Sequence, residues 1–122
     1  MLKNGFEKTV EELFKERADV LYRTGAALSD ALREVTSIEK KIEDHMEALK
    51  DLAGHDDSKT MERIYAEANR EISRYNRARE SAKVRYHYLI ITREAMGIRR
   101  HTWVEEIYRI PPRKQPLSRA RG

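Results

Sequence analysis

The chain has 122 residues, of which 38% are charged, with five glycines, three prolines and no cysteine. This length fits one domain, and a composition so rich in charge and so poor in helix breakers is typical of long helices rather than of a β-sheet. The lack of cysteine excludes disulfides, thiolate zinc sites and thiol nucleophiles. No signal-peptide core precedes the domain and no apolar run is long enough to span a bilayer, so we expect a cytoplasmic protein.

The net charge of +4 conceals an acidic half and a basic half. Residues 1–58 hold 9 basic and 14 acidic side chains, residues 59–82 hold 6 and 4, and residues 83–122 hold 10 and 3. If the halves pack together, opposite charges beside the seam select orientation and register. If the basic end is free, it attracts polyanions. We expect the packed arrangement.

An apolar residue recurs every seven positions in the first half of the chain. The series is Phe14, Leu21, Leu28, Val35, Ile42 and Leu49. Further apolar residues beside it widen the stripe, which is typical of a helix that touches more than one neighbour. We predict a helix over residues 5–53, capped by Asn4 with Glu7 three residues later. Gly25 lies inside it, and because glycine weakens a helix, it indicates close approach of a neighbour.

The apolar period resumes after a short polar link and continues in steps of three and four. The series is Met61, Tyr65, Ala68, Ile72, Tyr75, Arg79, Ala82, Tyr86, Leu89, Arg93 and Met96. It predicts a second helix over residues 58–97, capped by Asp57 or Ser58. A link of about five residues forces the two helices to run antiparallel. The expected pairs are Ile42 with Ile72, Ile38 with Tyr75, Ala31 with Ala82, His45 with Ala68 and Gly25 with Leu89.

The first helix is expected to be longer than the second, which leaves Phe6, Val10 and Phe14 uncovered. Thr102 and Glu105 have the spacing of a capping box and predict a short third helix over residues 103–109. We expect this helix to fold back as a clasp that buries Trp103 against those apolar residues. The prediction is thus an all-α fold, a long antiparallel helical hairpin resembling a coiled coil, with one domain over residues 1–112 and a disordered basic tail over residues 113–122.

A second apolar stripe lies on the second helix, away from the expected seam. It consists of Val84, Tyr88, Ile91, Ala95 and Ile98. A hairpin buries one face of each helix, so this stripe requires the clasp, a second copy or a foreign protein. Closed dimers are the commonest oligomers, and we expect a homodimer that forms a four-helix bundle.

Signatures of catalysis are lacking. The four histidines are scattered, the Glu-x-x-His pair of di-iron bundles does not occur, and no phosphate-binding glycine loop or G-x-S-x-G elbow is present. We therefore expect no enzyme activity, metal, cofactor or small-molecule substrate.

Two functional classes stand well ahead of an enzyme, which is the third. The first is a helical protein-protein interaction module of the adaptor, chaperone or assembly-factor type that acts through the second stripe on a second copy or another helical protein. The alternative is a nucleic-acid-binding protein that uses the arginine-rich second helix and tail. Its candidate contacts are Arg74, Arg77, Arg85, Arg99, Arg100, Arg113, Lys114, Arg119 and Arg121.

Overall fold

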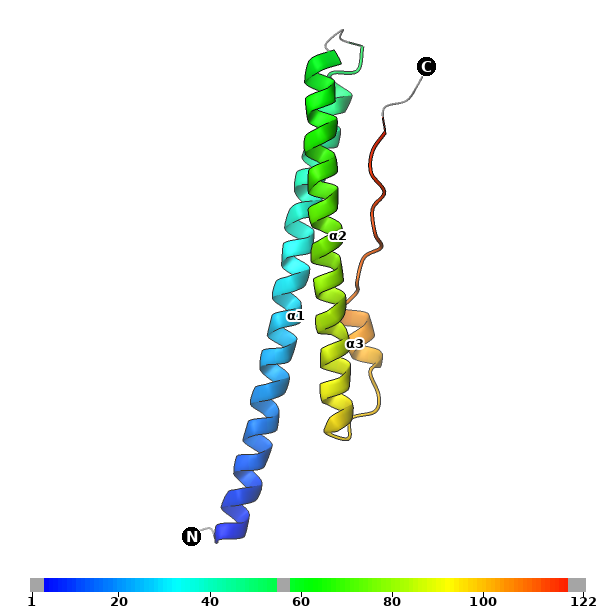
Figure 1. Ribbon diagram of the computed structural model, residues 1–122. Coiled ribbons are helices and arrows are strands. Elements are labelled where there is room, and N and C mark those ends of the chain that lie inside the picture. Colours follow the sequence, from blue (N-terminus) through cyan, green and yellow to red (C-terminus); the bar gives the residue numbers. More distant parts are fainter. Residues whose placement is uncertain (1–3, 55–57, 119–122) are drawn as a thin grey trace.

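The computed structural model describes residues 4–54 and 58–118, and this part of the chain is helical without strands. Its elements are α1 (Gly5–Asp51), α2 (Ser58–Ala95) and α3 (Thr102–Ile107). The two long helices run antiparallel and pack side by side along most of α2 (Figure 1). The predicted all-α helical hairpin is confirmed.

The predicted helix bounds differ from the observed ones by one or two residues. The first helix ends at Asp51 rather than residue 53, the second at Ala95 rather than residue 97, and the third covers Thr102–Ile107 rather than residues 103–109. Asn4 caps α1 as expected, because its Oδ1 accepts a hydrogen bond of 2.8 Å from the backbone N–H of Glu7. Ser58 is the first residue of α2, and the proposed cap Asp57 lies outside the described residues.

The core is the seam between α1 and α2. Its largest cluster of buried side chains is Val35, Ile38, Ile42, Ile72, Tyr75 and Ala82. The expected partners Ile42 and Ile72 belong to this cluster, as do Ile38 and Tyr75. Each buried aliphatic side chain of this size stabilises the fold by about 1.5–3 kcal/mol. The period of the apolar residues therefore predicts the seam correctly.

α2 ends in a hydrogen-bonded turn that reverses the chain. Gly97 has a φ of +84°, its N–H donates to the carbonyl of Glu94, and the N–H of Ile98 donates to the carbonyl of Arg93. This pair of bonds with a left-handed glycine is the Schellman motif. The chain consequently turns back along the hairpin towards the α1–α2 link (Figure 1).

The predicted clasp exists, but it covers a different part of α1. Val104 of α3 is fully buried with Leu28 and Leu89, whereas Trp103 is 49% exposed and packs its ring on the guanidinium of Arg93 at 4.9 Å. The prediction that Trp103 buries Phe6, Val10 and Phe14 is therefore wrong, because the Schellman turn directs the chain away from them. Phe6 and Phe14 remain 77% and 63% exposed.

Two further expectations about α3 need correction. His101, not Thr102, occupies the N-cap, and its side chain makes no capping bond. Instead the buried guanidinium of Arg93 donates to His101 Nδ1 and to the carbonyl of Arg100, which fixes where α3 begins. Gly25 is approached by the Tyr108 hydroxyl rather than by Leu89, since a Cβ at position 25 would lie 3.4 Å from that oxygen.

The C-terminal residues are ordered as far as they are described. Residues 109–118, here called the strap, run extended along the hairpin beside α2 (Figure 1). Ile110 and Leu117 pack against the seam cluster, and hydrogen bonds and ion pairs join the strap to both long helices. The expected disordered tail is thus wrong for residues 113–118, while residues 119–122 lie outside the described part.

The first turns of α1 extend beyond the end of α2. Residues 5–19, here called the arm, are exposed except for the half-buried Val10 (Figure 1). The arm carries Phe6, Leu13 and Phe14 on its surface. It is the part of the helical rod that the hairpin does not pack.

Candidate protein-binding groove

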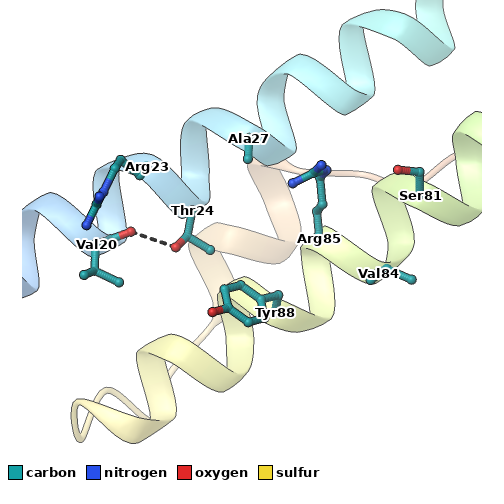
Figure 2. A pocket seen from close by; sticks show the side chains of 8 residues that line it. All are labelled: Val20, Arg23, Thr24, Ala27, Ser81, Val84, Arg85 and Tyr88. Atoms are coloured by element: carbon teal, nitrogen blue, oxygen red, sulfur yellow. Dashed lines mark hydrogen bonds between the residues drawn. The ribbon is translucent and has the colours of Figure 1, made fainter.

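Two helices packed side by side leave a groove on each side of their seam. α3 and the strap fill one of these grooves. The other is open and has a volume of about 690 Å³. Figure 2 shows the open groove in front, with α3 behind the two long helices.

Both long helices line the open groove. The lining residues are Val20, Arg23, Thr24, Ala27, Ser81, Val84, Arg85 and Tyr88. The Thr24 hydroxyl donates to the carbonyl of Val20 at 2.7 Å, so this polar group is satisfied within its own helix (Figure 2). Small side chains at Ala27 and Ser81 keep the groove open, while Arg23 and Arg85 add positive charge to its walls.

The second stripe runs from this groove along the outer face of α2. Val84, Tyr88 and Ile91 are 67%, 62% and 62% exposed, and Ala95 is also exposed. Ile98 is half buried in the link to α3. The clasp therefore leaves four of the five stripe residues accessible. Apolar side chains gathered on one exposed face are typical of an interaction site rather than of a solvated surface.

The candidate nucleic-acid contacts do not form one free cationic surface. Arg74 forms two hydrogen bonds with Glu71, Arg113 pairs with Glu80 at 3.4 Å, and Lys114 pairs with Glu39 at 3.3 Å. The exposed members of the set in the described residues are Arg77, Arg85, Arg99, Arg100 and Arg113. Arg119 and Arg121 lie outside the described residues.

Sequence reasoning missed two asparagines on α2 that contact the strap. Asn69 and Asn76 each form two hydrogen bonds with the strap backbone, at Leu117 and Lys114. The signal that could have found them is a pair of amides one heptad apart, each directly beside a seam position at Ala68 or Tyr75. A half-buried amide usually has a hydrogen-bond partner, and here the partner is the backbone of the strap.

Burial changes the acidity of two tyrosines on the filled side. The pKa of Tyr75 is raised, first because its phenol is buried and then because the carboxylate of Glu39 is near, although Arg79 acts in the opposite direction. The pKa of Tyr86 is raised by burial and by Glu105. Both phenols are thus kept in the neutral form, and Tyr75 uses its hydroxyl to donate to the carbonyl of Pro112 at 3.1 Å.

Within the described ranges, no three His, Asp or Glu side chains gather as they would to hold a metal ion. The same part of the chain has no helix with the length and apolarity needed to cross a membrane. Comparison of the chain with protein-family models, curated proteins and solved structures gave no match.

Proposed function

We propose that the chain is a non-enzymatic helical interaction module, of the adaptor, chaperone or assembly-factor type, that binds a second copy of itself. The observation that carries this proposal is the exposure of two apolar helix faces on one rod: the second stripe of α2 and the arm of α1. Exposed apolar faces of this kind are removed from water by association.

The two faces are similar in length. The arm has 15 helical residues, and the accessible part of the stripe spans 12, from Val84 to Ala95, so at 1.5 Å per residue they are about 22 Å and about 18 Å long. A two-fold axis would place the arm of each copy on the stripe of the other, which makes two identical contacts. Burying both could remove on the order of 1,000 Å² or more of surface, the size of a specific interface.

Their charges are complementary as well. The arm carries five acidic and three basic side chains, whereas residues 83–100 carry five basic and one acidic. Opposite charges beside an apolar contact select the orientation of the two helices. The arginines at the open groove, Arg23 and Arg85, would face the glutamates of the arriving arm.

The open groove would form the centre of the contact between the two copies. Its volume of about 690 Å³ accommodates a large aromatic side chain. Phe6 and Phe14 are the aromatic residues that the arm presents. Inserted phenylalanines next to Tyr88 would form the buried cluster that usually dominates the affinity of an interface.

Nucleic-acid binding through the arginine-rich helix and strap is the weaker proposal. Arg74, Arg113 and Lys114 each contact a carboxylate of the same chain. A phosphate would have to compete with these contacts, which reduces the charge available for the release of counterions from nucleic acid.

Light scattering of the full chain tests self-association. At micromolar concentration the wild type should have twice the chain mass of 14.4 kDa, and Tyr88→Glu should be a monomer with unchanged helical circular dichroism. Tyr22→Glu is the matched control, because Tyr22 is a similarly exposed tyrosine, 78%, that lies on the side of α3 and not in the open groove. It should leave the dimer intact.

A substitution in the arm provides a second test of self-association. Phe14→Glu should also produce monomers, because the arm and the stripe meet in the same contact. A dimer that survives Phe14→Glu but not Tyr88→Glu would mean that two stripes pack on each other. A monomeric wild type would contradict self-association, and retention of RNA or DNA at about 50 mM salt would favour the nucleic-acid alternative.

A further inference from the structure

The strap is held in the way that a receptor holds a peptide. The side-chain amide of Asn76 donates to the carbonyl of Lys114 at 2.9 Å and accepts from the N–H of the same residue at 2.9 Å. Asn69 repeats this pair of bonds at Leu117, at 3.0 and 2.7 Å. Each asparagine thus satisfies both backbone groups of one strap residue, as a neighbouring β-strand would.

The spacing of these contacts fits an extended chain. Asn69 and Asn76 are seven helical residues apart, about 10.5 Å at 1.5 Å per residue. Lys114 and Leu117 are three residues apart, about 9–10 Å at the rise of polyproline II or a β-strand. Two positions one heptad apart on α2 therefore contact two strap residues that are three positions apart.

The spacing of three strap residues continues towards the start of the strap. The guanidinium of Arg79 donates to the carbonyl of Pro111 at 2.7 Å, three residues before Lys114. The contacts at residues 111, 114 and 117 repeat with the period of polyproline II, and the hydroxyl of Tyr75 adds a bond to the carbonyl of Pro112 between them. Prolines at positions 111, 112 and 116 favour that conformation in the unbound peptide. A partly preformed ligand loses less entropy on binding.

Side chains add selectivity to this backbone recognition. Leu117 and Ile110 pack on the apolar seam cluster at the two ends of the contact. Between them the Lys114 ammonium lies 3.3 Å from Glu39 of α1 and 5.0 Å from the ring centroid of Tyr75, so it contacts both long helices. Arg113 pairs with Glu80 on the outer side. The site therefore favours a basic residue between two apolar anchors.

We propose that this face of the hairpin is a binding site for an extended, proline-containing basic segment of another protein, and that the strap is its intramolecular ligand. The partner's segment would carry an apolar residue, prolines, a lysine or arginine and a second apolar residue at the spacing of the strap. The strap competes at the effective concentration of a tethered ligand, in the millimolar range, so a partner binds only when the strap opens. This site shares no residue with the open groove and is independent of self-association.

The test uses a fluorescent peptide with the sequence of residues 109–118, RIPPRKQPLS, and the full chain. The variant Ile110→Asp/Leu117→Asp removes both anchors of the chain's own strap and leaves α1 and α2 unchanged. We expect the peptide to bind this variant with saturation, at least about tenfold more tightly than it binds the wild type, in which the strap occupies the site. The control protein adds Asn69→Leu and Asn76→Leu and should lose this binding. The control peptide carries aspartate at both anchor positions and should not bind.

Failure of the peptide to bind a helical Ile110→Asp/Leu117→Asp variant would overturn the proposal. If the peptide instead dissociates a wild-type dimer, the occupant is the strap of a second copy, and a foreign partner is rejected. If that variant does not fold, hydrogen exchange of the wild-type protein provides a second test of the proposal. The N–H groups of Lys114 and Leu117 should exchange through a local opening, faster than those of Ile72 in the seam. Exchange at the same rate as the seam would make the strap a fixed part of the fold and refute the proposal.

Discussion

Val104 is the buried side chain of α3, and Val104→Ala measures its contribution to the docking of this helix. Val104 is fully buried between Leu28 and Leu89. The substitution removes two methyl groups, worth about 0.8 kcal/mol each on transfer from water. The cavity left behind adds to this loss because the surroundings relax only in part. We expect the free energy of unfolding to fall by about 2–3 kcal/mol.

Thermal and urea unfolding followed by circular dichroism at 222 nm give this free energy. For a domain of this size a loss of 2 kcal/mol lowers the melting temperature by about 8 °C. All proteins are compared at one concentration, because association stabilises the folded chain by mass action. The matched control is Ile107→Ala in the same helix, whose side chain is 63% exposed. Its effect should stay within about 0.5 kcal/mol.

A Val104→Ala protein as stable as the wild type would refute the packing of α3 on Leu28 and Leu89. A second readout separates global unfolding from release of α3 alone. The Trp103 ring lies on the Arg93 guanidinium, so its fluorescence should change when α3 leaves the hairpin. Fluorescence and circular dichroism should report one transition, and an earlier fluorescence transition would show that α3 unfolds separately.

Three more substitutions test the backbone turns and the strap. Gly25→Ala should raise the unfolding free energy by about 0.5–1 kcal/mol, because alanine favours the helix and the nearest atom at 3.4 Å is the movable Tyr108 hydroxyl. Gly97→Ala should lower the unfolding free energy by about 1 kcal/mol, because Gly97 has a φ of +84°. If urea unfolding gave changes of the same sign for both variants, it would contradict these two assignments. Burial raises the pKa of Tyr75, so its neutral phenol stabilises the fold at pH values below the unfolded-state pKa of about 10. This stabilisation is lost as the pH rises through the higher folded-state pKa. Melting temperatures between pH 8 and 11 should therefore fall more for the wild type than for Tyr75→Phe, and parallel curves would contradict the burial of a neutral phenol that donates to Pro112.

The hairpin was predictable because its information is local and periodic. Apolar residues at positions such as Val35, Ile42 and Ile72 recur with the helical period, and a short link permits only an antiparallel return. The cap at Asn4 follows from a side chain and a backbone N–H three residues apart. Each of these inferences needs only neighbours in sequence or a single pairing register.

The position of the clasp was not predictable by the same means. Exposed aromatic side chains cost free energy, which favours coverage of Phe6 and Phe14, but their coverage also depends on the direction of the chain after α2. The Schellman turn at Gly97 sends the chain back along the hairpin, and Arg93 then fixes the link through the carbonyl of Arg100. Burial of Val104 within this return path replaced the expected burial of Trp103.

The order of the strap could not be predicted from the sequence of the strap alone. Prolines and basic residues in "IPPRKQPLS" indicate disorder when the segment is considered alone. Order comes from Asn69 and Asn76, which lie about forty residues earlier in the chain and contribute through backbone bonds that carry no sequence pattern in the strap itself. Further side-chain contacts hold the strap as well, from Arg79 and Tyr75 to the carbonyls of Pro111 and Pro112 and through the ion pairs of Arg113 and Lys114. We therefore propose two separate binding surfaces on the chain, the open groove for the arm of a second copy and the strap site for an extended segment of a partner.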